Sequence, residues 1–146
     1  MYKKEITLDQ SFIKDKVLIH FDGVDQECDV FVNSIKVGEN KGGYIPFTCE
    51  IKDALNIDET NVITVIVRDT LNHDYPWGKQ RIDRKGMWYT PVSGIWQTVW
   101  MEPVAENRIE SLKTTPDIDA GTLNIKPIVK ADESCVAEGK LYDGGN

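Results

Sequence analysis

The sequence predicts an all-β fold, a sandwich or barrel built from short strands. Apolar and polar side chains alternate in short runs that follow one another at intervals of roughly ten residues, the spacing typical of small β-sandwich domains. Gly, Pro and Asn separate these runs, and no stretch keeps a helical apolar period long enough to form a regular helix. Strand pairing should therefore organise the chain.

The first two runs predict neighbouring strands. Residues 16–22 place Val17, Ile19 and Phe21 on one face, because side chains alternate across a strand. Residues 28–33 repeat the pattern, with Cys and Val at the even positions. A tight turn at the end of this run, at Asn33 and the following Ser, leads into a further run and predicts a hairpin.

Two later runs predict further strands of the same domain. Residues 61–69 are apolar on both faces, which favours a central strand covered on both sides. Residues 95–102 carry Trp96 and Trp100 on one face, where packing is the expected role of both rings. A single helical turn is expected near residues 52–55.

The chain should divide into two domains after a linker-like segment at residues 102–107. The first sandwich is expected to span residues 1–104, and residues 105–146 to form the truncated start of a second β domain. Three strands are expected there, at residues 108–115, 122–130 and 135–142.

Composition and charge exclude several classes of function. The chain has 146 residues and a net charge of −7 without any basic run, so nucleic acid is not an expected partner. No apolar run approaches the roughly 18 residues of a membrane span. The three cysteines form no C-x-x-C pair, which favours buried free thiols in a reducing compartment.

The sequence shows no catalytic or metal-binding motif. The chain is far shorter than the roughly 250 residues of a (β/α)8 barrel, and no pair of carboxyl groups stands on a rigid apolar element. Neither G-x-S-x-G nor H-E-x-x-H occurs. The acidic residues Asp22, Asp25 and Asp29 flank a turn, but a calcium site is the weaker interpretation. No catalytic residue, metal or cofactor is predicted.

Aromatic residues in an irregular segment are the best candidates for ligand binding. The segment from Thr70 to about Lys85 is long, polar and without strand pattern, and such loops are often functional. Aromatic planes stack on the apolar faces of sugar rings, while polar neighbours bind the hydroxyl groups. The candidates in and beside this segment are Tyr75, Trp77, Arg84, Trp88 and Tyr89. The alternative is that Trp88 and Tyr89 only pack the loop onto the sandwich.

Several strings of residues carry a family resemblance. They are FDGVD (21–25), VFVN (30–33), VG (37–38), GYIPF (43–47) and WYTPVSGIWQTVW (88–100). In this order, over about residues 2–104, they resemble the N-terminal domain of glycoside hydrolase family 2, which includes β-galactosidases, β-glucuronidases and β-mannosidases. Residues 109–116 resemble the first strand of the family's immunoglobulin-like second domain.

The resemblance implies a galactose-binding-like jelly-roll β-sandwich, followed by a partial immunoglobulin-like β domain. It also implies a parent enzyme whose catalytic carboxylates lie on a (β/α)8 barrel in another part of the polypeptide. The family's usual first strand, ahead of Tyr2, is expected to be missing as well. The chain is thus expected to be a fragment trimmed at both ends.

The resemblance assigns one candidate role directly. In family β-galactosidases the residue after the F-D-G-V string helps to hold the sugar, and Asp25 stands here where those enzymes have Asn. An ionised Asp only accepts hydrogen bonds, whereas Asn also donates. Trp88 stands where those enzymes have Asp, and Ser34 where Gly is frequent, so the loop and the hairpin turn are expected to differ.

The expected function is that of a non-catalytic fragment of a family 2 glycosidase. It would support the catalytic barrel of the same chain and help to shape the carbohydrate site. Two alternatives remain open, a stand-alone carbohydrate-binding module and a purely structural or oligomerisation domain. Carbohydrate and the barrel are the expected partners, and a homo-oligomer is compatible with the sequence.

Overall fold

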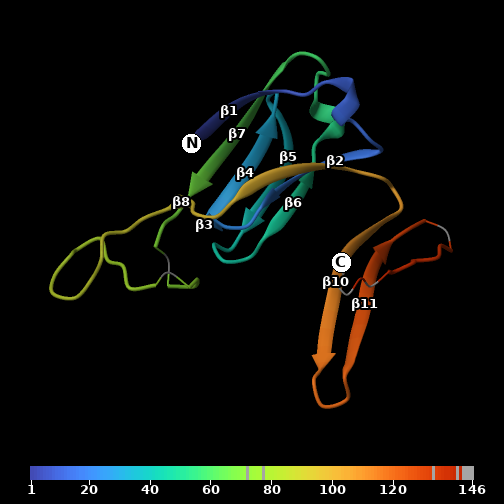
Figure 1. Ribbon diagram of the computed structural model, residues 1–146. Coiled ribbons are helices and arrows are strands. Elements are labelled where there is room, and N and C mark those ends of the chain that lie inside the picture. The colour runs from blue at the N-terminus through green and yellow to red at the C-terminus, as the bar shows by residue number, and fades with distance from the viewer. Residues whose placement is uncertain (72, 77, 133, 141, 143–146) are drawn as a thin grey trace. The chain divides into compact units, whose positions relative to one another are not determined.

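The computed structural model describes residues 1–71, 73–76, 78–132, 134–140 and 142 (Figure 1). Its backbone contacts divide the chain into two compact units, Met1–Pro103 and Val104–Asn146. The regular elements of the described residues are strands and two short 3₁₀ helices. The predicted all-β class is therefore confirmed.

The first unit is a β-sandwich (Figure 1). Its strands are β1 (Tyr2–Thr7), β2 (Lys16–Phe21), β3 (Val24–Asp25), β4 (Glu27–Val32), β5 (Ile35–Lys41), β6 (Phe47–Glu50), β7 (Thr60–Arg68), β8 (Gly94–Ile95) and β9 (Val99–Val104). One sheet has the strand order β1-β7-β4-β5 and the other has the order β6-β2-β9. The short strands β3 and β8 pair with each other in a separate ladder.

The hydrophobic core is built by the predicted alternation. The inward-facing residues of β2, β4 and β7 form one buried cluster, and β6 adds Cys49. The members from the first three strands are Val17, Ile19, Phe21, Cys28, Val30, Val32, Ile63 and Val65. Phe21 stacks on Phe47 with ring centroids 4.8 Å apart, which joins β2 to β6. Burial of these side chains is the main force that closes the sandwich.

The cysteines take two different environments. Cys28 and Cys49 are buried free thiols, as expected, and burial raises the pKa of Cys49 to about 11. Cys135 is also free but exposed, so the expectation of burial is wrong for this residue.

The hairpin of β4 and β5 has the predicted turn. Asn33 and Ser34 both adopt positive φ, at 49° and 70°, and Val32 pairs with Ile35. Positive φ at both central residues characterises the type I′ turn, whose twist matches that of the flanking strands. Ser34 adopts this conformation although it is not glycine.

Strand β7 lies between β1 and β4, as predicted for a central strand, but only one of its faces is fully buried. Ile63 and Val65 point into the core, whereas Val62 and Ile66 on the other face are half-buried. The apolar residues on both faces of β7 therefore predicted more burial of the outer face than the structure shows.

A buried asparagine fixes the start of β7. The Asn61 side chain is fully buried, and its Oδ1 accepts from the Asn33 side chain at 2.6 Å and from the Asn56 backbone at 2.7 Å. Its Nδ2 donates to the carbonyl oxygens of Asn56 and Glu59. All the hydrogen-bonding groups of this amide are thus satisfied inside the protein, as burial requires.

Of two expectations about local structure, one is confirmed and the other is wrong. The predicted helical turn is present as the 3₁₀ helix η2 (Lys52–Ala54), and a second one, η1 (Gln10–Phe12), is capped by Asp9. The predicted strand over residues 95–102 is two strands instead. Ile95 ends β8, which pairs with β3, and β9 begins only at Val99.

The second unit contains an antiparallel ribbon of β10 (Arg108–Asp117) and β11 (Thr122–Lys130). Both strands were predicted. The third strand, expected at residues 135–142, is wrong, because residues 134–140 have no regular structure. Apolar side chains of the ribbon such as Leu112 and Ile128 stay exposed, and a two-stranded ribbon by itself buries too little surface to order a third strand.

Candidate functional site

A shallow depression opens at the end of the sandwich where β3 and β8 pair. It has a volume of about 290 Å³. Its lining residues are Asp25, Tyr44, Gln80, Val92, Ser93, Gly94 and Trp96. These come from four parts of the sequence, so the depression exists only in the folded sandwich. Of the residues predicted as candidates, Asp25 lies in this depression.

Backbone pairing positions Asp25. Asp25 lies opposite Gly94 in the β3–β8 ladder, and the Asp25–Gln26 peptide bond is cis. Partial burial raises the pKa of the Asp25 carboxyl, and the nearby negative charge of Asp69 raises it further. The carboxyl is thus an acceptor in a partly desolvated setting, close to a second acid.

The turn that follows β5 is held against Asp25 by two side chains. Gln26 accepts a hydrogen bond from the Gly43 backbone N–H at 3.2 Å through its buried side chain. The indole N–H of Trp96 donates to the Gly43 carbonyl oxygen at 2.7 Å. A Cβ atom at Gly43 would overlap the Asp25 carboxyl, so this position needs glycine for close approach.

Gly94 brings a second close approach to the same place. Its φ is +122°, a conformation that other residues rarely adopt, and a Cβ here would meet the hydroxyl group of Tyr2. The side chain of β1 therefore reaches the strand that pairs with Asp25. Gly43 thus lets the backbone approach the Asp25 carboxyl, whereas Gly94 leaves room for the Tyr2 hydroxyl group.

Two half-exposed aromatic rings border the depression. Tyr44 and Trp96 meet edge to face, with ring centroids 5.6 Å apart and an interplanar angle of 66°. Their exposed fractions are 54% and 51%, so a substantial part of each side chain remains open to solvent. Rings of this kind offer an apolar surface beside hydrogen-bonding groups, the combination that suits a sugar ring.

Sequence analysis did not single out these two aromatic residues as candidates for ligand binding. Tyr44 stood only within the family string at residues 43–47, and Trp96 was expected to pack on a regular strand. The structure places Trp96 in the break between β8 and β9, where its backbone N–H donates to the Gly23 carbonyl oxygen at 3.2 Å. The signal that was available was the Gly42–Gly43 pair directly before Tyr44.

The other described candidates lie in or beside the long loop of residues 70–85, outside the lining of the depression. Lys41 approaches the Tyr75 ring at 5.0 Å, and Arg81 approaches Trp88 at 5.4 Å. Lys79 lies 5.6 Å from the centre of the Tyr89 ring. Arg84 donates to the Thr90 hydroxyl at 3.1 Å. Trp77 lies outside the described residues.

The loop is tied together by its own backbone. The Tyr89 N–H donates to the Lys79 carbonyl oxygen at 3.0 Å, and the Arg81 N–H donates back to the Tyr89 carbonyl oxygen at 3.2 Å. Gln80 accepts a hydrogen bond from the Val92 N–H at 2.7 Å through its side chain. Gln80 therefore connects the loop to the lining of the depression.

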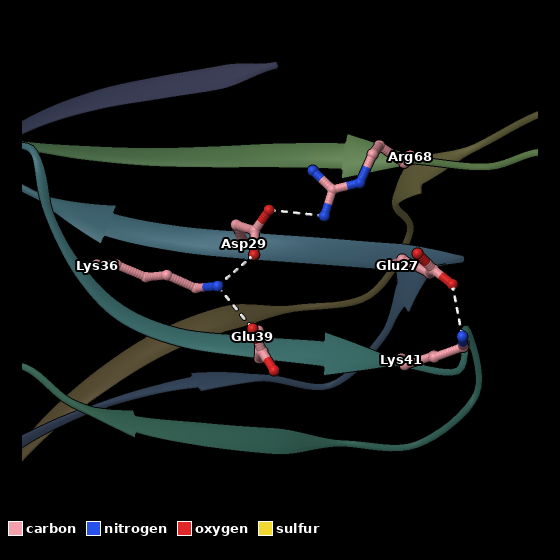
Figure 2. A network of polar contacts seen from close by, with 6 residues as sticks. All are labelled: Glu27, Asp29, Lys36, Glu39, Lys41 and Arg68. Atoms are coloured by element: carbon pink, nitrogen blue, oxygen red, sulfur yellow. Dashed lines mark hydrogen bonds and ion pairs between the residues drawn. The ribbon is translucent and has the colours of Figure 1, made fainter.

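The three acidic residues considered for calcium do not converge. Asp29 on the outer face of the four-stranded sheet binds Lys36 at 2.8 Å and Arg68 at 2.6 Å, as Figure 2 shows. Asp22 accepts from the Trp100 indole at 3.4 Å, while Asp25 lies in the depression. Within the described residues, no group of His, Cys, Asp and Glu is arranged to hold a metal ion.

Trp100 has a structural contact on the three-stranded sheet. Its ring stacks on His20 with centroids 3.9 Å apart, and the histidine is held by Thr48 at 2.8 Å and Glu102 at 3.2 Å.

In the described part of the chain, no helix is both long and apolar enough to cross a membrane.

The comparisons with known proteins agree on one family. The family model for the sugar-binding domain of glycosyl hydrolases family 2 matches residues 1–103. A β-galactosidase of Thermoanaerobacter pseudethanolicus is 32% identical over 76% of this chain and 14% of its own length. A β-galactosidase of Thermoanaerobacterium thermosulfurigenes is 35% identical over 67% of this chain and 13% of its own length. The chain thus spans a small part of these relatives.

Solved structures share the fold. A β-glucuronidase from Ruminococcus gnavus superposes on 90% of this chain and 24% of its own, with a TM-score of 0.68 and 19% identity. A glycosyl hydrolase family 2 member from Bacteroides cellulosilyticus covers 77% of this chain and 14% of its own, with a TM-score of 0.58 and 24% identity.

The first unit is therefore an all-β sandwich domain with an aromatic-rimmed acidic depression at one end. The chain belongs to glycosyl hydrolase family 2, and residues 1–103 are its sugar-binding domain. The chain corresponds to the N-terminal domain region of β-galactosidase-like and β-glucuronidase-like proteins.

Proposed function

We propose that this chain is the non-catalytic N-terminal part of a family 2 glycosidase, in which the first unit supports the catalytic barrel and helps to shape the carbohydrate site. In this proposal Asp25 accepts a hydrogen bond from a sugar hydroxyl. The Tyr44 and Trp96 rings border the same site. The chemical step belongs to carboxylates in the remaining sequence of the glycosidase.

The placement of Asp25 carries the proposal. A carboxyl group that only closes a turn would gain from full solvation, yet this one lies in a depression and is partly desolvated. Its backbone is fixed by the β3–β8 ladder, and the facing turn is fixed by Gln26 and Trp96. Such rigid positioning suits a group that must meet a ligand in one geometry.

The family supports the carbohydrate class. Relatives of this chain carry the names β-galactosidase and β-glucuronidase, and the matching model is a sugar-binding domain. The chain spans 14% or less of the two β-galactosidases, so most of each relative lies outside the matched region. A supporting role beside a separate catalytic domain agrees with these proportions.

The test uses a full-length family 2 glycosidase that contains this chain. Asp25→Ala should lower kcat/KM by roughly ten-fold or more, since a hydrogen bond to a charged group contributes about 1.5–3 kcal/mol. Asp53→Ala is the matched control: it also removes one carboxyl group, but in the 3₁₀ helix η2 and not at the depression. Unchanged kinetics for Asp25→Ala, with the fold intact, would leave a purely structural role for this domain.

A second candidate is a stand-alone carbohydrate-binding module. The half-exposed rings of Tyr44 and Trp96 favour it, because a binding surface needs accessible aromatic planes. Titration of the 146-residue chain with monosaccharides and oligosaccharides, followed by tryptophan fluorescence, separates the two. Specific binding at millimolar concentration or below supports the module, and no binding supports the accessory domain.

A further inference from the structure

The depression around Asp25 has an acidic character. Among the described residues that line it, Asp25 is the one that carries a charge at neutral pH. Asp69 adds a second negative charge close enough to act on the Asp25 carboxyl. The remaining lining groups are the uncharged amide, hydroxyl, phenol, indole and aliphatic groups of Tyr44, Gln80, Val92, Ser93, Gly94 and Trp96. A bound anion would therefore meet like charge in this depression.

The cations Lys79, Arg81 and Lys85 contact side chains in or beside the long loop. Lys79 and Arg81 lie over the rings of Tyr89 and Trp88, and Lys85 pairs with Asp83 at 3.5 Å. Among the described residues, none of these cations lines the depression. Lys79 and Arg81 thus interact with aromatic rings in or beside the loop and not with the depression.

The ion-paired cation Lys41 also makes its contacts outside the lining of the depression. Lys41 binds Glu27 at 3.1 Å, as Figure 2 shows, and lies over the Tyr75 ring. Its pKa is raised by the hydrogen bond to Tyr75 and by that to Glu27, so this cation is held by both partners. Lys41 is absent from the lining of the depression among the described residues.

We infer that the Asp25 depression selects uncharged glycosides and disfavours uronides, so that Asp25 acts as a specificity residue by charge as well as by hydrogen bonding. The inference rests on the proposed function, since it requires the sugar to approach Asp25. Two carboxylates within several ångströms repel strongly where water is partly excluded, whereas a hydroxyl donates to Asp25 instead. The substrate class that fits is a neutral β-glycoside.

The experiment compares two inhibitors that differ only at one carbon. D-Galactose and D-galacturonate share their hydroxyl stereochemistry, and galacturonate carries a carboxylate in place of the hydroxymethyl group. Their inhibition constants are measured with the full-length glycosidase, against whichever nitrophenyl β-glycoside it hydrolyses. The variants are Asp25→Asn, which keeps the shape of the side chain, and Glu39→Gln, which removes one charge from the ion pair with Lys36 on the outer sheet face.

The wild type should bind galactose more tightly than galacturonate, and Asp25→Asn should narrow the ratio of the two constants by at least about three-fold. Glu39→Gln should leave the ratio unchanged. If Asp25→Asn weakens both sugars equally, Asp25 contacts sugar without selecting charge, which overturns this inference and leaves the proposed function standing. If Asp25→Asn and Asp25→Ala both leave every constant unchanged, the inference and the proposed function fail together.

Discussion

The indole of Trp96 donates a hydrogen bond to the carbonyl oxygen of Gly43, with 2.7 Å between nitrogen and oxygen. This contact joins residues 53 positions apart in the sequence and ties the turn after β5 to the break between β8 and β9. The Asp25 carboxyl lies against the same glycine. The geometry of the depression therefore depends on this contact together with the hydrogen bond from the Gly43 N–H to the Gln26 side chain.

Trp96→Phe removes the donor and retains an aromatic ring. The half-buried Gly43 carbonyl then loses its partner, and we expect the free energy of unfolding to fall by about 1 kcal/mol. Urea unfolding of the 146-residue chain measures this change. Trp100→Phe is the control, since its indole is 3.4 Å from Asp22 and that contact is exposed. Equal losses in both variants would contradict the role given to Trp96.

Gly43→Ala places a methyl group against the Asp25 carboxyl. Such crowding in a packed site costs about 1–3 kcal/mol, and the loss should be smaller when Asp25→Ala is also present. Gly139→Ala, at a position with open space around it, should have little effect. A double-mutant cycle by thermal and urea unfolding checks the coupling. Strict additivity of Gly43→Ala and Asp25→Ala would show that the two residues do not press on each other.

The pH dependence of Asp25→Asn follows from the raised pKa of this carboxyl. Because the folded state raises the Asp25 pKa, ionisation costs stability. That cost is absent below the unfolded pKa and becomes complete as the pH rises through the folded pKa. Asp25→Asn should therefore stabilise the chain more at about pH 7 than at about pH 3.5. Melting temperatures at both pH values measure the difference.

Asp9 gives a control of opposite sign. Hydrogen bonds from the Ser11 side chain and backbone lower the pKa of Asp9, so its contribution is present above the unfolded pKa and is lost as the pH falls through the folded pKa. Asp9→Asn should thus lower the melting temperature at about pH 7 and have less effect in acid. The same sign of change for both variants at neutral pH would contradict this account.

Most of the sandwich follows from sequence pattern because its core strands largely alternate, with Leu18 of β2 the buried exception. Val17, Ile19 and Phe21 are buried as the period of two requires. Strand β1 gives no such signal, because five of its six residues are exposed and its position is set by pairing with β7. Local pattern also could not show that β8 leaves β9 to pair with β3.

The candidate site was predictable at one residue only. Asp25 stands in a string that resembles the family, whereas Tyr44 and Gln80 reach the depression through turns whose geometry depends on distant contacts. The Tyr44 turn is held by Gln26 and Trp96, neither of which is near it in sequence. The composition of the long loop suggests aromatic candidates, but composition does not determine how a loop folds.

The Asn61 network gives a prediction for the sandwich itself. Asn61→Ala removes the partner of four partly buried hydrogen bonds to Asn33, Asn56 and Glu59. We expect a loss of about 2–4 kcal/mol in the free energy of unfolding, since each intramolecular hydrogen bond contributes about 0.5–1.5 kcal/mol net. Asn40→Ala, which removes one hydrogen bond to Gly42 at 3.1 Å, should cost much less. Urea unfolding compares the two, and a loss below 1 kcal/mol for Asn61→Ala contradicts the prediction.

The most direct measurement is a crystal structure of the full-length glycosidase with a bound, uncleaved monosaccharide. The account predicts a sugar hydroxyl within about 3.2 Å of an Asp25 carboxylate oxygen, with Trp96 and Tyr44 beside the sugar. A sugar bound with Asp25 covered by other protein, and no hydroxyl within reach of it, would contradict the claim that this domain shapes the carbohydrate site.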